Sequence, residues 1–261
     1  MMRSDLSRRT VLVSVLCSTL FVAGCSAPSA SAQLAYMSAE VSGDISLDSG
    51  GGSSEQGLGS AFGLGDAQGA PYLRGQVEAG GPVFTGSLLW MSDNGSGQLD
   101  GGFGQINQVP NQIADVSSKL DLGLGKFSAA YELELGPVSV APGLLVDVFA
   151  LDFTALEPIT GTAESIDELL VVPMPFLRAE VELGPFAAVG ELGYMEIDGI
   201  GDTEGTFLDA EAMLHYYPVP FANVFVGYRQ VELDGSGSSG GDEFATDFSL
   251  TGWMVGGGIR F

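Results

Sequence analysis

Cysteine, histidine, basic side chains and long apolar segments are all scarce in this chain of 261 residues. Both cysteines, Cys17 and Cys25, lie near the N-terminus, so the remaining chain has no thiol for a disulfide or a thiolate metal site. Nine Lys and Arg stand against 33 Asp and Glu, and the resulting net charge of −24 opposes binding to nucleic acid. The apolar run near the N-terminus is too short to span a bilayer as a helix, which argues against a helical membrane protein.

The first 24 residues have the features of an export signal. Three arginines lie among the first nine residues, and an apolar run from Val11 to Gly24 follows them. A basic start followed by a short apolar stretch is typical of a signal peptide that is removed on export. We therefore expect residues 1–24 to be a signal peptide and exclude them from the fold.

Two cleavage sites are possible after this signal. Residues 22–25, Val-Ala-Gly-Cys, resemble the lipobox of bacterial lipoproteins, in which Cys25 is acylated and becomes the first residue. Residues 30–32, Ala-Ser-Ala, would instead permit ordinary signal-peptidase cleavage before Gln33. We favour lipidation of Cys25 because the apolar run ends there. Residues 25–32 would then form a linker of small side chains.

The chain ends in a segment with a two-residue period and a terminal Phe261. Val255 and Ile259 would face one side of a strand there, and Arg260 the other. This ending resembles the closing strand of Gram-negative outer-membrane β-barrel proteins, in which a final Phe is the insertion signal read by the barrel-assembly machinery. The resemblance is architectural, covers residues 33–261 and names no subfamily. It implies an antiparallel transmembrane β-barrel in the cell outer membrane, in contact with outer-membrane lipid.

Short turns and longer acidic stretches alternate along residues 33–261. The longer stretches, rich in Gly, occupy about 48–69, 93–118, 155–170, 199–205 and 235–243. Short turns on one side and long loops on the other are typical of outer-membrane barrels, and their number predicts about ten strands, within a range of about 8 to 12. The short turns lie at 80–82, 136–137, 184–185 and 218–220.

Apolar and polar residues alternate within the expected strands. In 206–217, Leu and Ala alternate with Asp209, Glu211 and His215, as in a strand with two unlike faces. The alternation slips near Lys126, where Leu120, Leu122 and Leu124 give way to Phe127 and Ala129. We interpret this slip as a β-bulge.

Charged residues of the strands are predicted to fill the lumen. All six bases beyond the signal lie in expected strands, and four of them, Arg74, Arg178, Arg229 and Arg260, have inward parity. Charges in a narrow lumen need partners, and a ten-stranded barrel is much narrower than porins of about sixteen strands. We therefore expect a salt-bridge plug, with a cation-selective path as the alternative. The expected acidic partners are Glu40, Glu78, Asp147, Glu180, Glu182, Glu191, Asp209 and Glu211.

His215 is the only histidine and so the only candidate for histidine-based hydrolysis. Outer-membrane lipid A deacylases have a Ser two residues after the catalytic His, and outer-membrane proteases have an Asp two residues before it. Tyr217 and Met213 occupy these positions here, so neither resemblance extends to His215. We expect no enzyme activity and no catalytic residue.

One loop carries a weak metal-binding signal. Asp198, Asp202 and Glu204 are close together on a Gly-rich stretch, and carboxylate oxygens are suitable calcium ligands. The spacing is not that of an EF-hand, so a solvated acidic loop is the favoured interpretation. Weak calcium binding is the alternative, and no other cofactor is expected.

The sequence thus predicts a non-enzymatic outer-membrane barrel with acidic surface loops and a lumen closed by ion pairs. A narrow cation-preferring channel and a soluble β-rich outer-membrane lipoprotein are the alternatives. The ligand and the oligomeric state are not specified by any motif.

Overall fold

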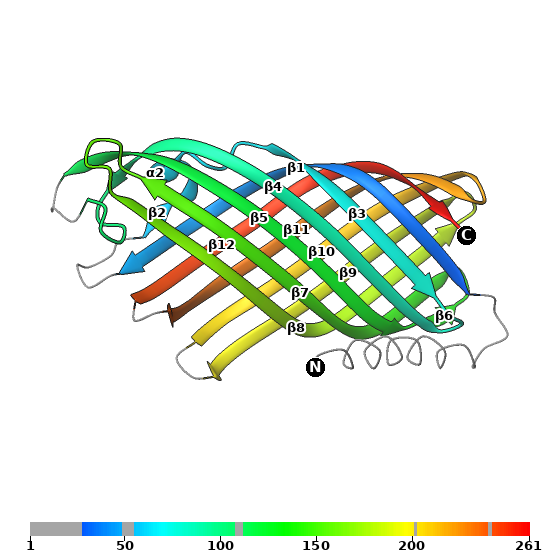
Figure 1. The fold of residues 1–261 in the computed structure, drawn as a ribbon. Coiled ribbons are helices and arrows are strands. Elements are labelled where there is room, and N and C mark those ends of the chain that lie inside the picture. Colours follow the sequence, from blue (N-terminus) through cyan, green and yellow to red (C-terminus); the bar gives the residue numbers. More distant parts are fainter. Residues whose placement is uncertain (1–27, 49–54, 108–111, 201–202, 240–241) are drawn as a thin grey trace, which may run out of the picture.

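The computed structural model describes residues 28–48, 55–107, 112–200, 203–239 and 242–261. They form a closed antiparallel barrel of ten long strands, in which neighbours along the chain pair and β12 pairs with β1 (Figure 1). No helix among the described residues is long and apolar enough to cross a bilayer. The elements are β1 (Ser29–Asp48), β2 (Gln56–Gly57), α2 (Leu58–Phe62), β3 (Gln68–Glu78), β4 (Pro82–Asp100), β5 (Ile113–Tyr131), β6 (Leu133–Leu135), β7 (Val138–Leu156), β8 (Ala163–Leu183), β9 (Phe186–Ile200), β10 (Thr203–Val219), β11 (Ala222–Ser239) and β12 (Asp242–Arg260).

The two ends of the barrel differ as the sequence predicts. Tight turns at the end that we call the turn end use glycines with positive φ, including Gly80 (64°), Gly136 (74°) and Gly184 (64°). Both chain termini of the barrel meet at this end, where Phe261 N–H donates to the Ala30 carbonyl (2.8 Å). β1 therefore begins at Ser29, four residues before the predicted start.

The opposite end, the loop end, has shorter loops than predicted. β4 continues to Asp100, and only residues 157–162 separate β7 from β8. Strands of up to 21 residues exceed the roughly 10 that cross a bilayer. The acidic stretches are largely strand because polar side chains can alternate on a sheet face that meets water.

The predicted bulge near Lys126 is absent, and this prediction was wrong. β5 pairs with β4 and β7 without a register shift through Lys126. Leu120, Leu124 and Lys126 all point inward, while Phe127 points outward. The same alternate residues of β5 point inward along the whole strand. What changes is the chemistry of the lumen, which is apolar at Leu120 and charged at Lys126.

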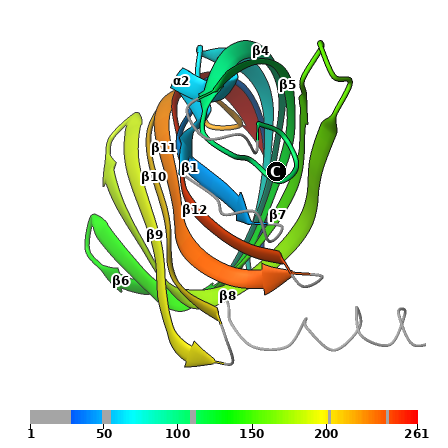
Figure 2. The same cartoon turned by 90° about the vertical axis from the view of Figure 1, so that its left-hand side faces the viewer.

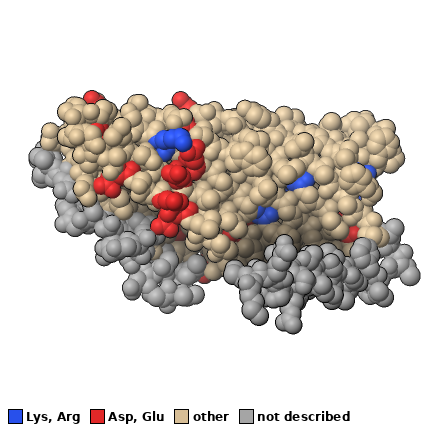
Figure 3. Space-filling model, in the orientation of Figure 1, with Lys and Arg blue, Asp and Glu red and all other residues tan. Residues whose placement is uncertain are grey.

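The outer surface carries an apolar band limited by carboxylates. Asp121, Asp152 and Asp167 are register partners across β5, β7 and β8 and form one acidic row above the band. Figure 3 shows acidic side chains gathered toward the loop end of this face, whereas its turn-end half shows only scattered basic patches and few acidic side chains. Exposed side chains of the band include Leu34, Leu88, Trp90, Leu144, Leu177, Leu192, Val226, Trp253 and Val255.

Inside the barrel, the loop-end half is filled by an apolar core. The segment of β2 and α2 lies beside β4 at this end (Figure 2), and Phe62 of α2 contacts Phe103 and Phe153 with ring centroids 5.1 and 4.9 Å apart. Ser118 Oγ donates to the Phe62 carbonyl (2.6 Å). We call the buried residues around these three rings the apolar lumen core.

Candidate functional site

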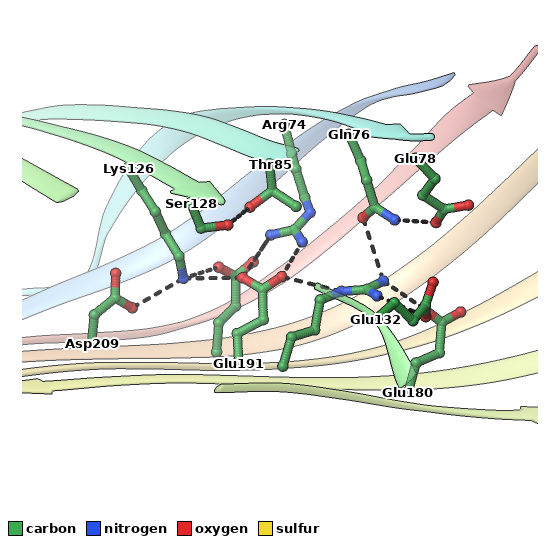
Figure 4. Close-up of polar contacts among 12 residues, drawn as sticks. Arg74, Gln76, Glu78, Thr85, Lys126, Ser128, Glu132, Glu180, Glu191 and Asp209 are labelled. Carbon is green, nitrogen blue, oxygen red and sulfur yellow. Dashed lines mark hydrogen bonds and ion pairs between the residues drawn. The ribbon is translucent and has the colours of Figure 1, made fainter. Parts of the chain in front are cut away.

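The turn-end half of the lumen contains a buried, charge-balanced cluster. Seven strands contribute four bases and four acids, all 3% exposed or less and all on inward strand faces. Figure 4 shows the part of the cluster around Glu191. Burial of ionised groups is costly unless partners of opposite charge lie close to them. The members of this charged lumen network are Arg74, Lys126, Arg178, Arg229, Asp147, Glu191, Asp209 and Glu211.

Glu191 on β9 is the centre of the network. Arg74 binds it with two guanidinium nitrogens, Nη1 to Oε2 at 3.1 Å and Nη2 to Oε1. Lys126 Nζ lies 3.1 Å from Glu191 Oε2, and Arg178 Nε lies 3.6 Å from Glu191 Oε1. Three cations from three strands therefore converge on one carboxylate, and the bidentate pair fixes its orientation.

Asp209 and Glu211 extend the network along β10. Arg229 Nη2 donates to Asp209 Oδ2 (2.7 Å). Lys126 Nζ lies 3.3 Å from a Glu211 carboxylate oxygen and 3.5 Å from one of Asp209. Tyr72 Oη donates to Glu211 Oε1 (2.6 Å). The ion pairs thus bridge the barrel wall to wall, because β10 and β5 are not neighbours in the sheet.

Toward the turn end the pairs become more accessible. Arg178 binds Glu180 and lies 3.8 Å from Glu132. Arg260, predicted as an inward member, pairs with Glu78 at 3.5 Å, and its side chain is 43% exposed. Arg260 therefore belongs to the mouth of the lumen and not to its buried centre.

The structure brings together most of the residues predicted for this site. Glu182 is exposed at the turn end and forms none of the ion pairs among the described residues. Asp147 is buried beside Asp209 but likewise makes no direct ion pair within the described part of the chain. The predicted members that lie close together are Arg74, Arg178, Arg229, Glu180, Glu191, Asp209 and Glu211.

Two assignments need correction. Glu40 points outward, because Met37, Ala39 and Val41 of β1 fill the apolar lumen core, and the opposite parity meets solvent. Lys126 is not among the four bases predicted to point inward, yet it does so and binds three carboxylates. The alternation of Leu120, Leu122 and Leu124, continued without a bulge to residue 126, would have identified Lys126 as inward from the sequence.

His215 lies in the same half of the lumen and is 3% exposed. Its ring packs against Phe225, with centroids 5.2 Å apart, near Tyr217 at 6.2 Å. The hollow beside it at the turn-end mouth, lined by Arg74, Arg178 and Asn223 among others, measures about 30 Å³. Such a space holds one or two water molecules and is too small for a substrate.

The remaining predicted sites lie outside the described residues. Cys25 and Asp202 are not described, nor are the side chains of Asp198 and Glu204, although both belong to strands. No group of metal-binding side chains occurs among the residues that are described. Lipidation and calcium binding therefore stay predictions.

Comparison with known proteins identifies the fold. No protein-family model and no curated protein sequence matches the chain. The solved structure of the outer-membrane protease OmpT from Escherichia coli is similar, with 12% identity and a TM-score of 0.52 over 90% of this chain and 96% of that one. The translocator domain of the autotransporter NalP from Neisseria meningitidis has 14% identity and a TM-score of 0.42, covering 98% and 95% of the two chains. The chain has the fold of bacterial outer-membrane β-barrels.

Proposed function

We propose that this protein is a non-enzymatic outer-membrane barrel that is closed by its own side chains and presents its acidic loop end at the cell surface. The observation that carries the proposal is the charged lumen network. Seven of its eight members, all but Asp147, are joined by ion pairs at 3% exposure or less, so they leave little free charge to attract a permeating ion. The apolar lumen core fills the other half of the same passage.

Location in the outer membrane is supported by the apolar band. Leu34 and Trp253 are each 68% exposed, and they belong to a contiguous belt of outward apolar residues. Soluble proteins rarely expose apolar patches larger than a few hundred Å². This argues against the alternative of a soluble β-rich lipoprotein. The protein should resist carbonate extraction and should migrate differently on gels before and after boiling, and release by carbonate without a heat shift would contradict membrane insertion.

Recognition by the barrel-assembly machinery is proposed to depend on Phe261. This residue closes the barrel by pairing with Ala30, and it carries the aromatic side chain at the C-terminus. Deletion of Phe261 should therefore reduce the amount of heat-modifiable protein in outer-membrane fractions. Equal assembly without Phe261 would remove this role.

Acylation of Cys25 is supported by the start of β1. Ser29 Oγ donates to Glu78 (2.7 Å), and Ala30 pairs with Phe261. Cleavage before Gln33 would remove these contacts, whereas cleavage before Cys25 would retain them. Wild-type protein should incorporate labelled palmitate and the Cys25→Ala variant should not. A mature chain that starts at Gln33 would contradict acylation.

Orientation can be tested at the two ends of one strand. Gly161 precedes β8 and Gly184 follows it, and both have positive φ and open space around the position of a Cβ atom. An epitope inserted after Gly161 should bind antibody on intact cells. The same epitope after Gly184 should bind only once the outer membrane is permeabilised. The reverse pattern, or equal labelling of both, would contradict a surface-exposed loop end.

The narrow channel is the second candidate, and the charged lumen favours it over an enzyme. An ion would have to displace part of the network, because Lys126 and Glu191 lie 3.1 Å apart in the middle of the passage. The buried position of His215 also gives an external substrate no access to its ring. We therefore place the closed barrel first.

A further inference from the structure

The wall of the barrel is incomplete between β8 and β9. Their pairing ends at Phe176 and Gly193, yet β8 begins 13 residues earlier, at Ala163, and β9 continues to Ile200. In this part β8 pairs only with β7 and β9 only with β10, and the two strands diverge toward the loop end (Figure 1). We call this opening the β8–β9 seam.

Two prolines explain why the seam stays open. Pro173 and Pro175 lack the N–H that a ladder requires, and residues two apart direct this group to the same edge. Both pair with β7 in an unbroken register, opposite Val146 and Leu144. The missing donors must therefore be on the edge that faces β9. The sequence Pro-Met-Pro thus removes two consecutive hydrogen bonds that would close the wall.

A second gap in the wall is covered, which makes the seam distinct. β3 pairs with β4 only from Tyr72 to Glu78, and above this region α2 packs against β4. Gly95 and Gly97 of β4 allow this approach, since a Cβ atom there would lie 2.3 and 2.2 Å from carbonyl oxygens of α2. No described element pairs with the free edges of β8 and β9 in the same way.

The seam opens within the apolar band. On β8, Leu169 and Val171 point outward and are 68% and 54% exposed, and Tyr194 on β9 is 49% exposed. The acidic limit of the band comes just beyond, at Asp167 on β8. The part of the seam on the band side of Asp167 is therefore surrounded by acyl chains of the outer leaflet, if the barrel is oriented as proposed above.

An apolar cavity of about 390 Å³ lies directly behind this opening. Phe149, Leu233 and Phe248 line it from three strands of the inner wall. β8 contributes residues of both parities, such as Leu170 from its inner face and Leu169 from its outer face. A lining of seven consecutive residues, 164–170, places the cavity along the free edge of β8. The cavity therefore reaches the seam at Leu169 and Leu170, on the band side of Asp167.

We propose that the seam admits one alkyl chain of an uncharged amphiphile from the outer leaflet into this cavity. The volume is within the range of about 300–1,000 Å³ that is typical of ligand sites, and the lining is mainly apolar. Glu164, Asp167 and Glu168 also line the cavity, so a carboxylate head group would be repelled. The proposal rests on the membrane location proposed above.

The test uses a tryptophan reporter inside the cavity. Trp90 and Trp253 are replaced by Phe, Phe149→Trp is introduced, and the protein is reconstituted in phosphatidylcholine vesicles. The probes are 12-bromododecan-1-ol and 12-bromododecanoate, whose bromine quenches tryptophan on contact. Phe225→Trp is the control reporter, because Phe225 is also buried inside the barrel but does not line the cavity. For the Phe149→Trp reporter, we expect the alcohol to give half-quenching at a concentration at least fivefold below that needed with the carboxylate. The Phe225→Trp control should likewise need at least fivefold more alcohol than the Phe149→Trp reporter.

Closing the seam should abolish this preference. Pro173→Val with Pro175→Val restores both N–H donors. Pro142→Val is the matched control on β7, one strand away from the free edge of β8 and opposite Leu177. We expect the double variant to need at least fivefold more alcohol for half-quenching and the control variant to be unchanged. Equal quenching of both reporters, or full quenching in the closed-seam variant, would overturn the proposal. Carbonate extraction of the same samples distinguishes failure of this proposal from failure of the proposed membrane location. A barrel that resists carbonate but shows no selective quenching contradicts only lateral access through the seam.

Discussion

The two halves of the lumen are closed by opposite means. In the turn-end half, Arg74, Lys126 and Glu191 are buried in ion pairs behind an outer surface that is apolar. In the loop-end half, Phe62 and Phe153 pack in an apolar core behind an outer surface that carries carboxylates. The same strands run through both halves, so inward and outward faces exchange their chemical character at the level of the acidic row.

The proposed location in the outer membrane accounts for this exchange. Within the bilayer, lipid would require apolar side chains on the outside, and the narrow lumen would hold charges only as a balanced set. Beyond the bilayer, the outside meets water, and the inside becomes an ordinary protein core. The molecule therefore combines a membrane barrel and a water-soluble β-barrel on one set of strands.

The largest expected effect is in the charged half. Arg229→Ala leaves Asp209 buried with only Lys126, at 3.5 Å, as a remaining ion-pair partner. Breaking a buried ion pair by removing one partner costs about 3–5 kcal/mol. Urea unfolding in lipid vesicles should show this loss. A loss near the surface-pair value of about 0–1 kcal/mol would mean that water reaches the network.

The apolar half should respond less to a conservative change. Phe153→Leu shortens one ring of the apolar lumen core and should reduce stability by about 1–2 kcal/mol, because packing is lost but no charge is exposed. The same unfolding assay measures it. A loss above that of Arg229→Ala would contradict the contrast between the two halves.

Removing an ion pair as a whole should cost least among the buried changes. Arg229→Leu combined with Asp209→Leu deletes one positive and one negative charge, and Lys126 keeps Glu191 and Glu211 as partners. Replacing buried pairs by apolar residues is often neutral or stabilising. The double variant should unfold at a urea concentration equal to or above that of the wild type. If it is as unstable as Arg229→Ala, the pair itself stabilises the barrel.

The exposed ion pair between Lys119 and Asp121 is the reference for the three buried changes described above. Its side chains are 56% and 41% exposed on the outer surface near the acidic row. Lys119→Ala should leave the urea midpoint unchanged within error, since solvent screens this pair. A clear destabilisation would show that the acidic row needs Lys119 to offset the repulsion between Asp121 and Asp152.

The sequence predicts the architecture better than the details of each face. Gly-Pro turns and the two-residue period indicate ten strands, because turn chemistry and strand geometry are local properties. The inward positions of Arg74, Asp209 and Glu211 follow from the same parity. The bulge and the inward Glu40 were wrong because apolar residues were assumed to face outward along the whole strand. On the loop-end side of the acidic row the reverse is true, and only the position of a residue relative to the apolar band reveals it.

Other features depend on long-range contacts. The packing of α2 against β4 requires Gly95 and Gly97 opposite Phe62, a match between segments about 30 residues apart that no local pattern indicates. The β8–β9 seam depends likewise on which edge of β8 faces β9. Pro173 and Pro175 are visible in the sequence, but their consequence is visible only in the register.

Single-channel recording in planar lipid bilayers tests the closed lumen most directly. Wild-type protein, shown to be inserted by its heat-dependent mobility, should give no discrete conductance steps, because the charged lumen network closes the passage. Arg229→Ala, which opens one side of the charged lumen network, is the matched comparison and is recorded under identical salt and voltage. Regular cation-selective steps from the wild-type protein would contradict the account and establish the narrow channel.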